Sequence, residues 1–519
     1  MDLDIGSKTW QCICLRASHR QPPRQRPVKP EHLERENERL IREIERLREE
    51  LIGRDKKIAD AEKQIADLER KLALRQQNST TSSKPPSSDG MAGEQRPRGR
   101  GRRKSRRKPG GRPGHDGHWR GLAPLSRVDE FKKVFPSRCR HCDHRLSSGM
   151  PAEGDPRRHQ VTELPPIKAH ITEYQCYRVI CPECGKKTQA ELPPQAHRHF
   201  GAQLTALIAY LTVVCRMPRR VVHEVLEQVL AIPLSLGSIQ NSWEEVSEAV
   251  ADPCAELERQ LPNEPVVNSD ETGYRTSGEK RWLWALVSAN FVFYRIAASR
   301  GAEVLVQLPG EIYAGILCSD RCPTYLKYHK GVSQLCWAHF KRNILGVLEI
   351  GKTTDAERFC RDALALHARL FRLWHRFRDG PGVRYGPITR NQLIAKSIPL
   401  ERKFFALADR YLDSRDKDVA NLAGALLRHF EKFFAFLRHE GVEPTNNVAE
   451  RALRCAVQWR KISFGSRSAP GEIAVARLLT VTRTCRMQNR APLHYLATVL
   501  GSYRAGQAVP SLLKTASTT

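Results

Sequence analysis

A stretch in the middle of the chain, residues 265–336, constrains the fold most strongly. It alternates between short segments rich in aromatic and β-branched residues and segments with helical spacing. The predicted order is strand, strand, strand, helix, strand, helix, strand. The strand-forming segments are EPVVNSDETGYR, RWLWALVSA, FVFYRIAAS, IYAGILCSDRC and the start of SQLCWAHFKRN. This order limits the segment to a small number of mixed sheets covered by helices.

Two aspartates stand at the carboxyl ends of strands in this stretch. The strand order is that of a ribonuclease-H-like α/β core, in which the first and fourth strands are neighbours. Asp270 and Asp320 should then lie side by side. Two adjacent carboxylates repel each other unless a cation or a proton lies between them, and carboxylate oxygens are the ligands that Mg²⁺ prefers. The pair therefore predicts a site for Mg²⁺ or Mn²⁺, although either aspartate alone is often only a turn residue.

Composition points to a polyanionic partner. Lys and Arg number 86 and Asp and Glu number 57, which gives a formal net charge of +29. Nucleic acid is the leading candidate, ahead of an acidic protein or a membrane surface. The start of the chain lacks an apolar signal segment, and no apolar run is long enough to span a bilayer. We therefore expect a cytoplasmic protein whose 15 cysteines are reduced, with no membrane partner.

The N-terminal part shows a heptad repeat. Residues 1–30 have no clear period and are expected to be disordered, whereas residues 31–76 carry apolar residues every 3.5 positions. One seam position holds Asn37, Ile44, Leu51, Ile58, Ile65 and Leu72, and the other holds Leu33, Leu40, Leu47, Arg54, Ala61, Leu68 and Arg75. A single helix in solution would expose this apolar seam to water. We therefore expect a coiled-coil helix that joins copies of the chain into a homo-oligomer.

A basic linker follows, over residues 77–125. Between Arg96 and Arg112 the chain has ten Lys or Arg residues and no acid, interrupted by prolines and glycines. Such a run is either a solvated linker or a flexible arm that lies along phosphates, and the basic charge of the whole chain favours the arm. The residues predicted to contact DNA are Arg102, Arg103, Lys104, Arg106, Arg107 and Lys108.

Residues 126–198 contain two CxxC pairs. A CxxC turn points two thiolates at one ion, and two such pairs supply the four ligands of a structural Zn²⁺ site. The pairs are Cys139 with Cys142 and Cys181 with Cys184. The alternative is four unrelated cysteines, with Cys176, His141 and His144 as substitute ligands. Two pairs in a reduced protein favour a small zinc-binding domain.

Two helical regions flank the middle stretch. Residues 199–262 read as short helices that resemble a helix-turn-helix, with Ser235 or Ser238 as a helix cap. For these helices the sequence supports DNA binding and a purely structural packing role equally. Residues 351–440 read as a helical insertion into a core that spans 263–350 and 441–519, the latter ending in helices. Glu450 should lie in the first turn of a helix that also carries Arg451 and Arg454. These arginines beside a carboxylate suit a metal-bound phosphate site and are predicted to contact DNA, although spacing alone favours a surface ion pair.

Several motifs resemble the insertion-sequence-66 transposases, which are bacterial mobile-element proteins with a DDE catalytic core. The motifs are KPPSSDG, GGRPGHDG, the two CxxC pairs, SDET, CSD, CWAHFKR and NNVAERALR, in this order over roughly residues 33–505. The resemblance implies a multidomain α+β protein with a zipper-like helix, a zinc-binding domain, a helical DNA-binding region and an interrupted ribonuclease-H-like core.

The resemblance also implies a metal-binding triad. It matches Asp270 in NSDET, Asp320 in CSDRCPTY and Glu450 in NNVAER. Glu271 is the rival of Asp270, but alternation along a strand points it to the other face. In the CWAHFKR match, His339, Lys341 and Arg342 either contact DNA, orient the site or have a structural role. The sequence Arg321-Cys322-Pro323 departs from the small glycine-containing turn usual in the family, which leaves the activity of this copy open.

The expected function is metal-dependent DNA cleavage and strand transfer. The partners are the terminal repeats of an insertion sequence and its target DNA, with accessory proteins of the same element as further candidates. An inactive, zinc-containing DNA-binding protein derived from a transposase is the first alternative, and it needs no divalent metal to bind DNA. A nuclease that cleaves without joining is the second.

Overall fold

The computed structural model describes residues 30–76 and 121–513, except for 148, 152, 194–195, 352 and 380–385. Contacts divide the chain into two compact units, Met1–Gln77 and Asn78–Thr519. The protein combines many helices with a mixed β-sheet. The N-terminal segment that is predicted to be disordered lies outside the described residues. The same is true of most of the basic linker and of its six predicted DNA contacts.

The first unit contains one long helix, α1 (Pro30–Gln76), as the heptad repeat predicts. Its apolar seam faces solvent, since Ile44, Leu51 and Ile65 are 49%, 59% and 57% exposed. Ion pairs one turn apart, such as Lys71 with Asp67, stabilise the helix surface. The association of copies through this seam stays a prediction.

The cysteine-rich part of the second unit has little regular structure. Its two strands, β1 (Arg178–Ile180) and β2 (Lys187–Gln189), pair in antiparallel fashion. An isolated bridge joins Arg138 to Arg145, and a short 3-10 helix covers Leu125–Arg127. Most side chains here are exposed, so backbone hydrogen bonds rather than a buried core define the local structure.

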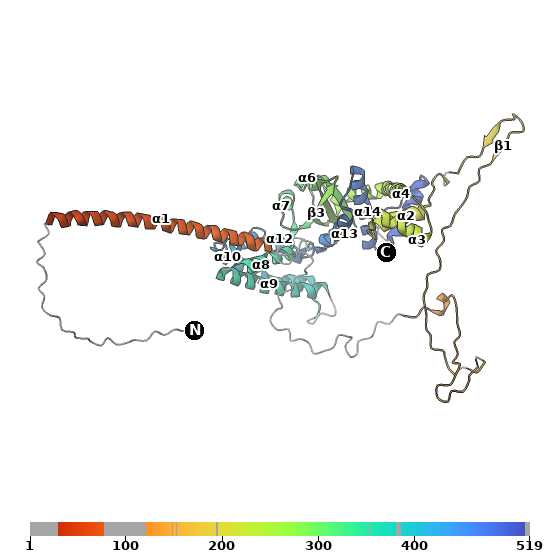
Figure 1. Ribbon diagram of the computed structural model, residues 1–519, viewed down its shortest axis with the longest axis horizontal. Coiled ribbons are helices and arrows are strands. Elements are labelled where there is room, and N and C mark those ends of the chain that lie inside the picture. The colour runs from red at the N-terminus through yellow and green to blue at the C-terminus, as the bar shows by residue number, and fades with distance from the viewer. Residues whose placement is uncertain are drawn as a thin grey trace, which may run out of the picture. The chain divides into compact units, whose positions relative to one another are not determined.

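Four helices precede the sheet: α2 (Ala202–Val213), α3 (Arg219–Leu230), α4 (Leu236–Ala249) and α5 (Ala251–Gln260). Ser235 caps α4 by accepting a hydrogen bond from the Ser238 N–H, as one of the two predicted caps. Ile208, Val222 and Ile239 form a small core between α2, α3 and α4. Figure 1 shows these helices beside α14.

A five-stranded sheet forms the centre of the second unit, in the order β5-β4-β3-β6-β7. The first three strands are antiparallel, whereas β6 and β7 run parallel to β3. The strands are β3 (Val266–Thr276), β4 (Glu279–Val287), β5 (Val292–Ala297), β6 (Ile316–Ser319) and β7 (Ser333–Leu335), with α6 (Ala302–Gln307) and α7 (Pro323–Tyr328) between the last three. The predicted order of elements and the adjacency of the first and fourth strands are confirmed.

Helices from the C-terminal part of the chain cover the antiparallel half of this sheet. They are α13 (Asn447–Ser463) and α14 (Ala469–Met487), whereas α15 (Pro492–Arg504) packs on α2, α4 and α14. Helix α13 packs on β3 and β4, and α14 packs along β5 (Figure 1). The hydroxyls of Thr480 and Thr484 accept hydrogen bonds of 3.0 and 3.1 Å from the backbone N–H groups of Tyr294 and Val292. Helix α14 thus satisfies the edge strand of the sheet.

A helical region with its own core follows β7 and begins at Trp337, before the insertion predicted for residues 351–440. Its helices are α8 (Trp337–Ile350), α9 (Thr354–Arg378), α10 (Arg390–Arg410), α11 (Lys417–Arg428) and α12 (Phe430–Arg438). Trp337 lies at the centre of this core, with the rings of Phe404, Phe433 and Phe434 about it at centroid distances of 5.1–5.4 Å. In the part of the chain that the structure describes, no helix has the length and apolar character that crossing a membrane requires.

Candidate metal centre

The register of two parallel strands places Asp270 and Asp320 level with each other. Asn268 of β3 pairs with Cys318 of β6, and each aspartate follows two positions later. Strand β6 ends at Ser319, so Asp320 lies at its carboxyl end as the sequence predicts. The same prediction is wrong for Asp270, which lies inside β3 because the strand continues to Thr276 in its antiparallel pairing with β4. The Cys322 N–H donates a 2.8 Å hydrogen bond to Asp320 Oδ1, and the Glu271 N–H donates one of 3.0 Å to Asp270 Oδ1. Backbone groups therefore hold one oxygen of each carboxylate.

Glu450 reaches the same region from the first turn of α13. The loop before this helix is fixed by Asn446, whose Nδ2 donates a 2.7 Å hydrogen bond to the Ser269 carbonyl on β3. The Asn446 N–H points to Cys336 Sγ at 3.2 Å, and its carbonyl accepts from the Glu450 N–H. Asn446 is 1% exposed. It therefore ties β3, the start of α8 and the start of α13 together beside the acids.

The charges of the three acids influence one another, although their ligand atoms are not a group that all lie within 4.8 Å of each other among the described residues. Burial raises the pKa of Asp270 well above its usual value, and the negative charges of Glu271, Asp320 and Glu450 raise it further. Glu450 Oε1 is buried without a hydrogen-bond partner among the described residues. A set of mutually repelling carboxylate oxygens with one orphaned oxygen fits a divalent cation, which removes the repulsion and occupies the free lone pairs.

Glu271, the rival of Asp270, lies on the opposite face of β3. Its side chain is 2% exposed and accepts a 2.7 Å hydrogen bond from Arg300 Nε. The Tyr325 hydroxyl donates to its other oxygen. Arg300 in turn stacks on Trp282, with 4.9 Å from the guanidinium carbon to the ring centroid. Both Glu271 oxygens are engaged in this network, which favours Asp270 as the metal-binding acid.

A second group of ligand atoms surrounds Glu450. Among the described residues, the ligand atoms of Cys336, His339 and Glu450 form the one group of such atoms that all lie within 4.8 Å of each other. His339 Nδ1 is 3.5 Å from Glu450 Oε1, and both atoms are buried without a hydrogen bond. Burial lowers the pKa of His339, while the charge of Glu450 raises it. Asp270 and Asp320 do not belong to this group.

Sequence reasoning considered His339 but missed Cys336. The signal for both was the Cys-x2-His spacing at the start of α8, because the cap residue and the third helical residue of one turn lie near each other. Of the predicted DNA contacts in the described part, Arg451 and Arg454 are exposed on α13 and Arg342 is partly buried. His339 is only 17% exposed in its side chain, and its location favours the orienting role.

The Arg321-Cys322-Pro323 turn fits the site. Pro323 is the first residue of α7, and Cys322 is extended at φ −61° and ψ 134°, as a residue before proline prefers. This conformation directs the Cys322 N–H at Asp320. Arg321 donates a 2.7 Å hydrogen bond to Asn343 Oδ1 and lies over the Phe340 ring. The departure from the family's turn therefore leaves the carboxylate of Asp320 anchored.

The two CxxC pairs form two similar turns. The Asp143 N–H donates to the Cys139 carbonyl and the Gly185 N–H donates to the Cys181 carbonyl, at 3.0 and 2.9 Å. Backbone N–H groups inside each turn lower the pKa of Cys139 and Cys181, those of His141 and Cys184 most strongly. Each turn is shaped to offer two thiolates to one ion. The four cysteines are not brought within ligand distance of one another, so the joint zinc site stays a prediction.

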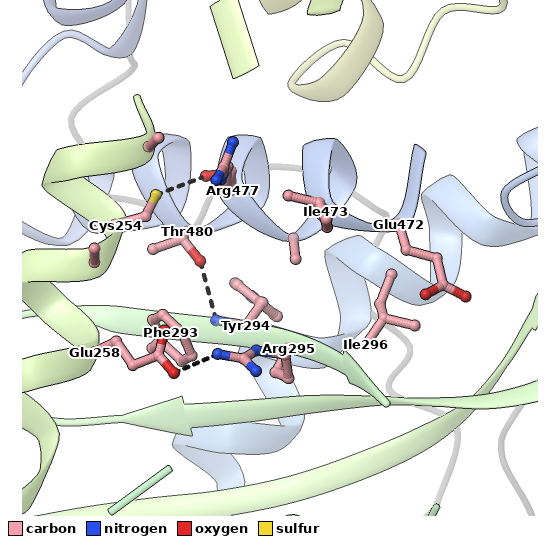
Figure 2. Close-up of a pocket in the computed structure, with 13 residues that line it drawn as sticks. Cys254, Glu258, Phe293, Tyr294, Arg295, Ile296, Glu472, Ile473, Arg477 and Thr480 are labelled. Carbon is pink, nitrogen blue, oxygen red and sulfur yellow. Dashed lines mark hydrogen bonds and ion pairs between the residues drawn. The ribbon is translucent and has the colours of Figure 1, made fainter. Parts of the chain in front are cut away.

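A cavity of about 370 Å³ lies elsewhere, between α5, the edge strand β5 and α14 (Figure 2). Arg295 and Glu258 form an ion pair in its wall, and Cys254 Sγ donates to the Arg477 carbonyl at 3.7 Å. None of the predicted site residues lines it. It is separate from the carboxylates, which lie at the opposite, parallel half of the sheet.

Comparison with known proteins gives two family matches. Residues 197–473 match the transposase IS66 family, and residues 20–121 match a family of unknown function (DUF6444). Two curated relatives come from Sinorhizobium fredii: the uncharacterized protein y4qI is 28% identical over 47% of this chain, and the uncharacterized protein y4hP is 30% identical over 40%. The matches cover 48% and 40% of those proteins, so the chain spans about half or less of their length.

The transposase match contains the sheet, the helical insertion and all three predicted acids. It extends over more than half of the 519 residues. The chain therefore belongs to the IS66 transposase family.

Proposed function

We propose that the protein is the transposase of an insertion sequence, which cleaves DNA and joins it to a target by metal-dependent phosphoryl transfer. The observation that supports this proposal most directly is the level register of Asp270 and Asp320 on neighbouring parallel strands, together with the effect of the Glu450 charge on Asp270. The strand order β5-β4-β3-β6-β7 supports a ribonuclease-H-like core. The family supports DNA as the partner, in agreement with the charge of +29.

In this proposal, Asp270 and Asp320 together hold the divalent ions, Mg²⁺ or Mn²⁺, and Glu450 completes the site from α13. Ions bound there stabilise the charge on the attacking and leaving oxygens of an in-line displacement. The hydrogen bond from the Cys322 N–H restricts rotation of the Asp320 carboxylate. The hydrogen bond from Asn446 to β3 holds the loop that positions Glu450. In this proposal the side chains hold the ions in fixed positions, and none of them forms a covalent bond to the DNA.

The remaining parts of the proposal concern binding. The basic linker and the helices α2–α4 hold DNA, while Arg451 and Arg454 on the exposed side of α13 contact phosphates next to Glu450. Helix α1 joins two or more copies, and Zn²⁺ binds the two CxxC turns. Accessory proteins of the element and a cytoplasmic, nucleoid-associated location belong to the same proposal.

A strand-transfer assay with Mg²⁺ tests the catalytic part. Asp270→Asn, Asp320→Asn and Glu450→Gln should each lower the rate of cleavage by about 10³-fold or more, since each removes several kcal/mol of charge stabilisation. Asp409→Asn is the matched control, because Asp409 is exposed on α10 away from the site.

DNA binding by each variant is measured in parallel by gel shift. Unchanged binding with lost cleavage supports the triad. Full activity in any one variant removes that residue from the site. Cleavage without joining by the unaltered chain replaces the transposase with a nuclease, and binding without any cleavage leaves the inactive DNA-binding protein.

A further inference from the structure

The group formed by Cys336, His339 and Glu450 has a geometry that the triad does not use. His339 Nδ1 faces Glu450 Oε1 at 3.5 Å, and neither atom has a hydrogen-bond partner among the described residues. Both side chains are mostly buried, with 17% and 28% of their surface exposed. When Nδ1 carries no proton, two electron-pair donors face each other in a largely buried space, which is unfavourable unless a cation lies between them.

We propose that His339 and Glu450 bind one divalent ion together, so that the ion at the third acid has mixed nitrogen and oxygen ligands and favours Mn²⁺ over Mg²⁺. This inference rests on the proposed function, because it concerns an ion of the same catalytic centre. It assigns to His339 the role of a metal ligand rather than that of a DNA contact.

The distance between the two donor atoms supports a shared ion. Ligand atoms at about 2.1 Å from a first-row ion, with angles between 90° and 110° at the ion, lie about 3.0–3.4 Å apart. A charged hydrogen bond between an imidazolium and a carboxylate instead closes to about 2.7–2.9 Å. The observed 3.5 Å is closer to the spacing of two ligands than to that of a hydrogen-bonded pair.

The frame around His339 holds its ring in place. The helix that carries it begins at Trp337, whose backbone N–H donates to the Pro444 carbonyl in the loop before Glu450. Phe340, the next residue after His339, is fully buried under the Arg321 guanidinium. Helix α8 and the loop before α13 are thus held against each other, which keeps the side chains of His339 and Glu450 in the same region.

Cys336 is the third member of the group, and its surroundings give it a different role. Its sulfur accepts a hydrogen bond from the Asn446 N–H at 3.2 Å, and its own N–H donates to the Ser319 carbonyl at 2.9 Å. Ser319 precedes Asp320, and Asn446 precedes the helix of Glu450 by one residue. Cys336 therefore acts as a positioning residue that links the strand of the second acid to the helix of the third.

The donor set decides the class of ion. An imidazole nitrogen is a better ligand for first-row transition ions than for Mg²⁺, which prefers oxygen ligands and retains water. The ion-binding position next to His339 should therefore prefer Mn²⁺ over Mg²⁺. Asp270 and Asp320, which offer oxygen only, complete the centre without that preference.

Pulsed electron paramagnetic resonance of the full chain with Mn²⁺ tests the inference, because it detects a nitrogen ligand directly. The unaltered protein should show a ¹⁴N coupling, which His339→Asn and Glu450→Gln should both remove. Asparagine is smaller than histidine but places a polar atom near the Nδ1 position without adding volume, so the fold should be preserved. His339→Asn should weaken Mn²⁺ binding roughly 10–100-fold while Mg²⁺ binding changes little. His375→Asn, a partly exposed histidine of α9, is the control.

The outcomes separate the inference from the proposed function. Loss of the ¹⁴N coupling in both variants, with retention in the control, supports a shared ion. Mn²⁺ binding that depends on Asp270 and Glu450 but shows no nitrogen coupling overturns the role of His339 and leaves the triad intact. Mn²⁺ binding that is indifferent to Asp270→Asn and Glu450→Gln overturns both.

Discussion

The sheet with its helices and the cysteine-rich segment 121–198 differ in how their backbone is held. The sheet is surrounded by a continuous core in which Leu283, Trp284 and Leu286 are fully buried. In the cysteine-rich segment, Val134, Val161 and Ile171 are 83–90% exposed. The first region is stabilised by removing apolar surface from water, whereas the second has turns and a two-stranded ribbon without a core to hold them.

This difference indicates what each region needs from outside. A short segment that cannot bury its apolar residues requires a metal, a disulfide or a partner to fold. The cysteines of the two CxxC turns are the proposed ligands for such a metal. The sheet and the insertion need no such addition for their stability, so the divalent ions proposed there serve chemistry rather than folding.

The strongest test of the comparison removes the proposed zinc. Treatment with a chelator, or the substitutions Cys139→Ser and Cys181→Ser, should unfold the cysteine-rich segment, because binding of a structural Zn²⁺ contributes about 10 kcal/mol to the folding of small domains. Limited proteolysis should show new cleavage between residues 121 and 198 while the sheet stays intact. Cys215→Ser is the control, since Cys215 is exposed and outside both pairs. Equal protection with and without metal contradicts the zinc site.

A substitution in the insertion tests the other side of the comparison. Phe433→Ala should lower the free energy of unfolding by about 3–5 kcal/mol, since it leaves a cavity beside the rings of Trp337 and Phe340. Urea denaturation measures the change. Phe405→Ala is matched in chemistry but removes a ring that is 50% exposed, so its effect should be much smaller.

Proteolysis of the same two variants sharpens the result. If Phe433→Ala also exposes the cysteine-rich segment to cleavage, the two regions fold as one cooperative unit and the comparison fails.

The smallest expected effect concerns the pH dependence of stability in the metal-free protein. The pKa of Asp270 is raised in the folded state by burial and by the neighbouring acids. Its contribution to stability is therefore fully present below the pKa of the unfolded chain and is lost as pH rises through the raised pKa. Asp270→Asn should be the more stable protein at neutral pH, with about 2–4 °C in melting temperature for each kcal/mol of relieved repulsion.

Thermal melts between pH 4 and pH 8, with and without Mg²⁺, measure this effect. Mg²⁺ should stabilise the unaltered chain and remove the advantage of Asp270→Asn at neutral pH. Asp409→Asn should follow the unaltered chain throughout. An unaltered protein that is more stable than Asp270→Asn at pH 7 without metal contradicts the repulsion.

Local pattern predicted the elements of the sheet because strand residues and strand ends leave a signal in consecutive positions. It placed Asp320 correctly at the end of β6 but was wrong for Asp270, which lies inside β3 because that strand continues to Thr276 in its pairing with β4. The parallel register of β3 and β6 brought the two acids level. Glu450 came only from family resemblance, since a helical glutamate next to arginines looks like a surface ion pair. The helix α1 and the Ser235 cap were equally local signals.

Contacts between distant segments left no such signal. The link from Asn446 to Ser269 joins residues 177 positions apart, and that from Asn446 to Cys336 joins residues 110 positions apart. Nothing near Asn446 in sequence distinguishes it from an ordinary turn residue. The threonines that satisfy the edge strand β5 lie on a helix almost 200 positions downstream and have the spacing of any helical pair.

The position of Glu450 after the insertion has a consequence for the order in which the protein is made. The ribosome synthesises the basic linker, the helices α2–α5 and the strand with Asp270 before it adds residues 351–450. A nascent or prematurely terminated chain therefore holds the segments proposed to bind DNA and two of the three acids without the third. Under the proposed function, the ability to bind DNA would arise earlier in synthesis than the ability to cleave it.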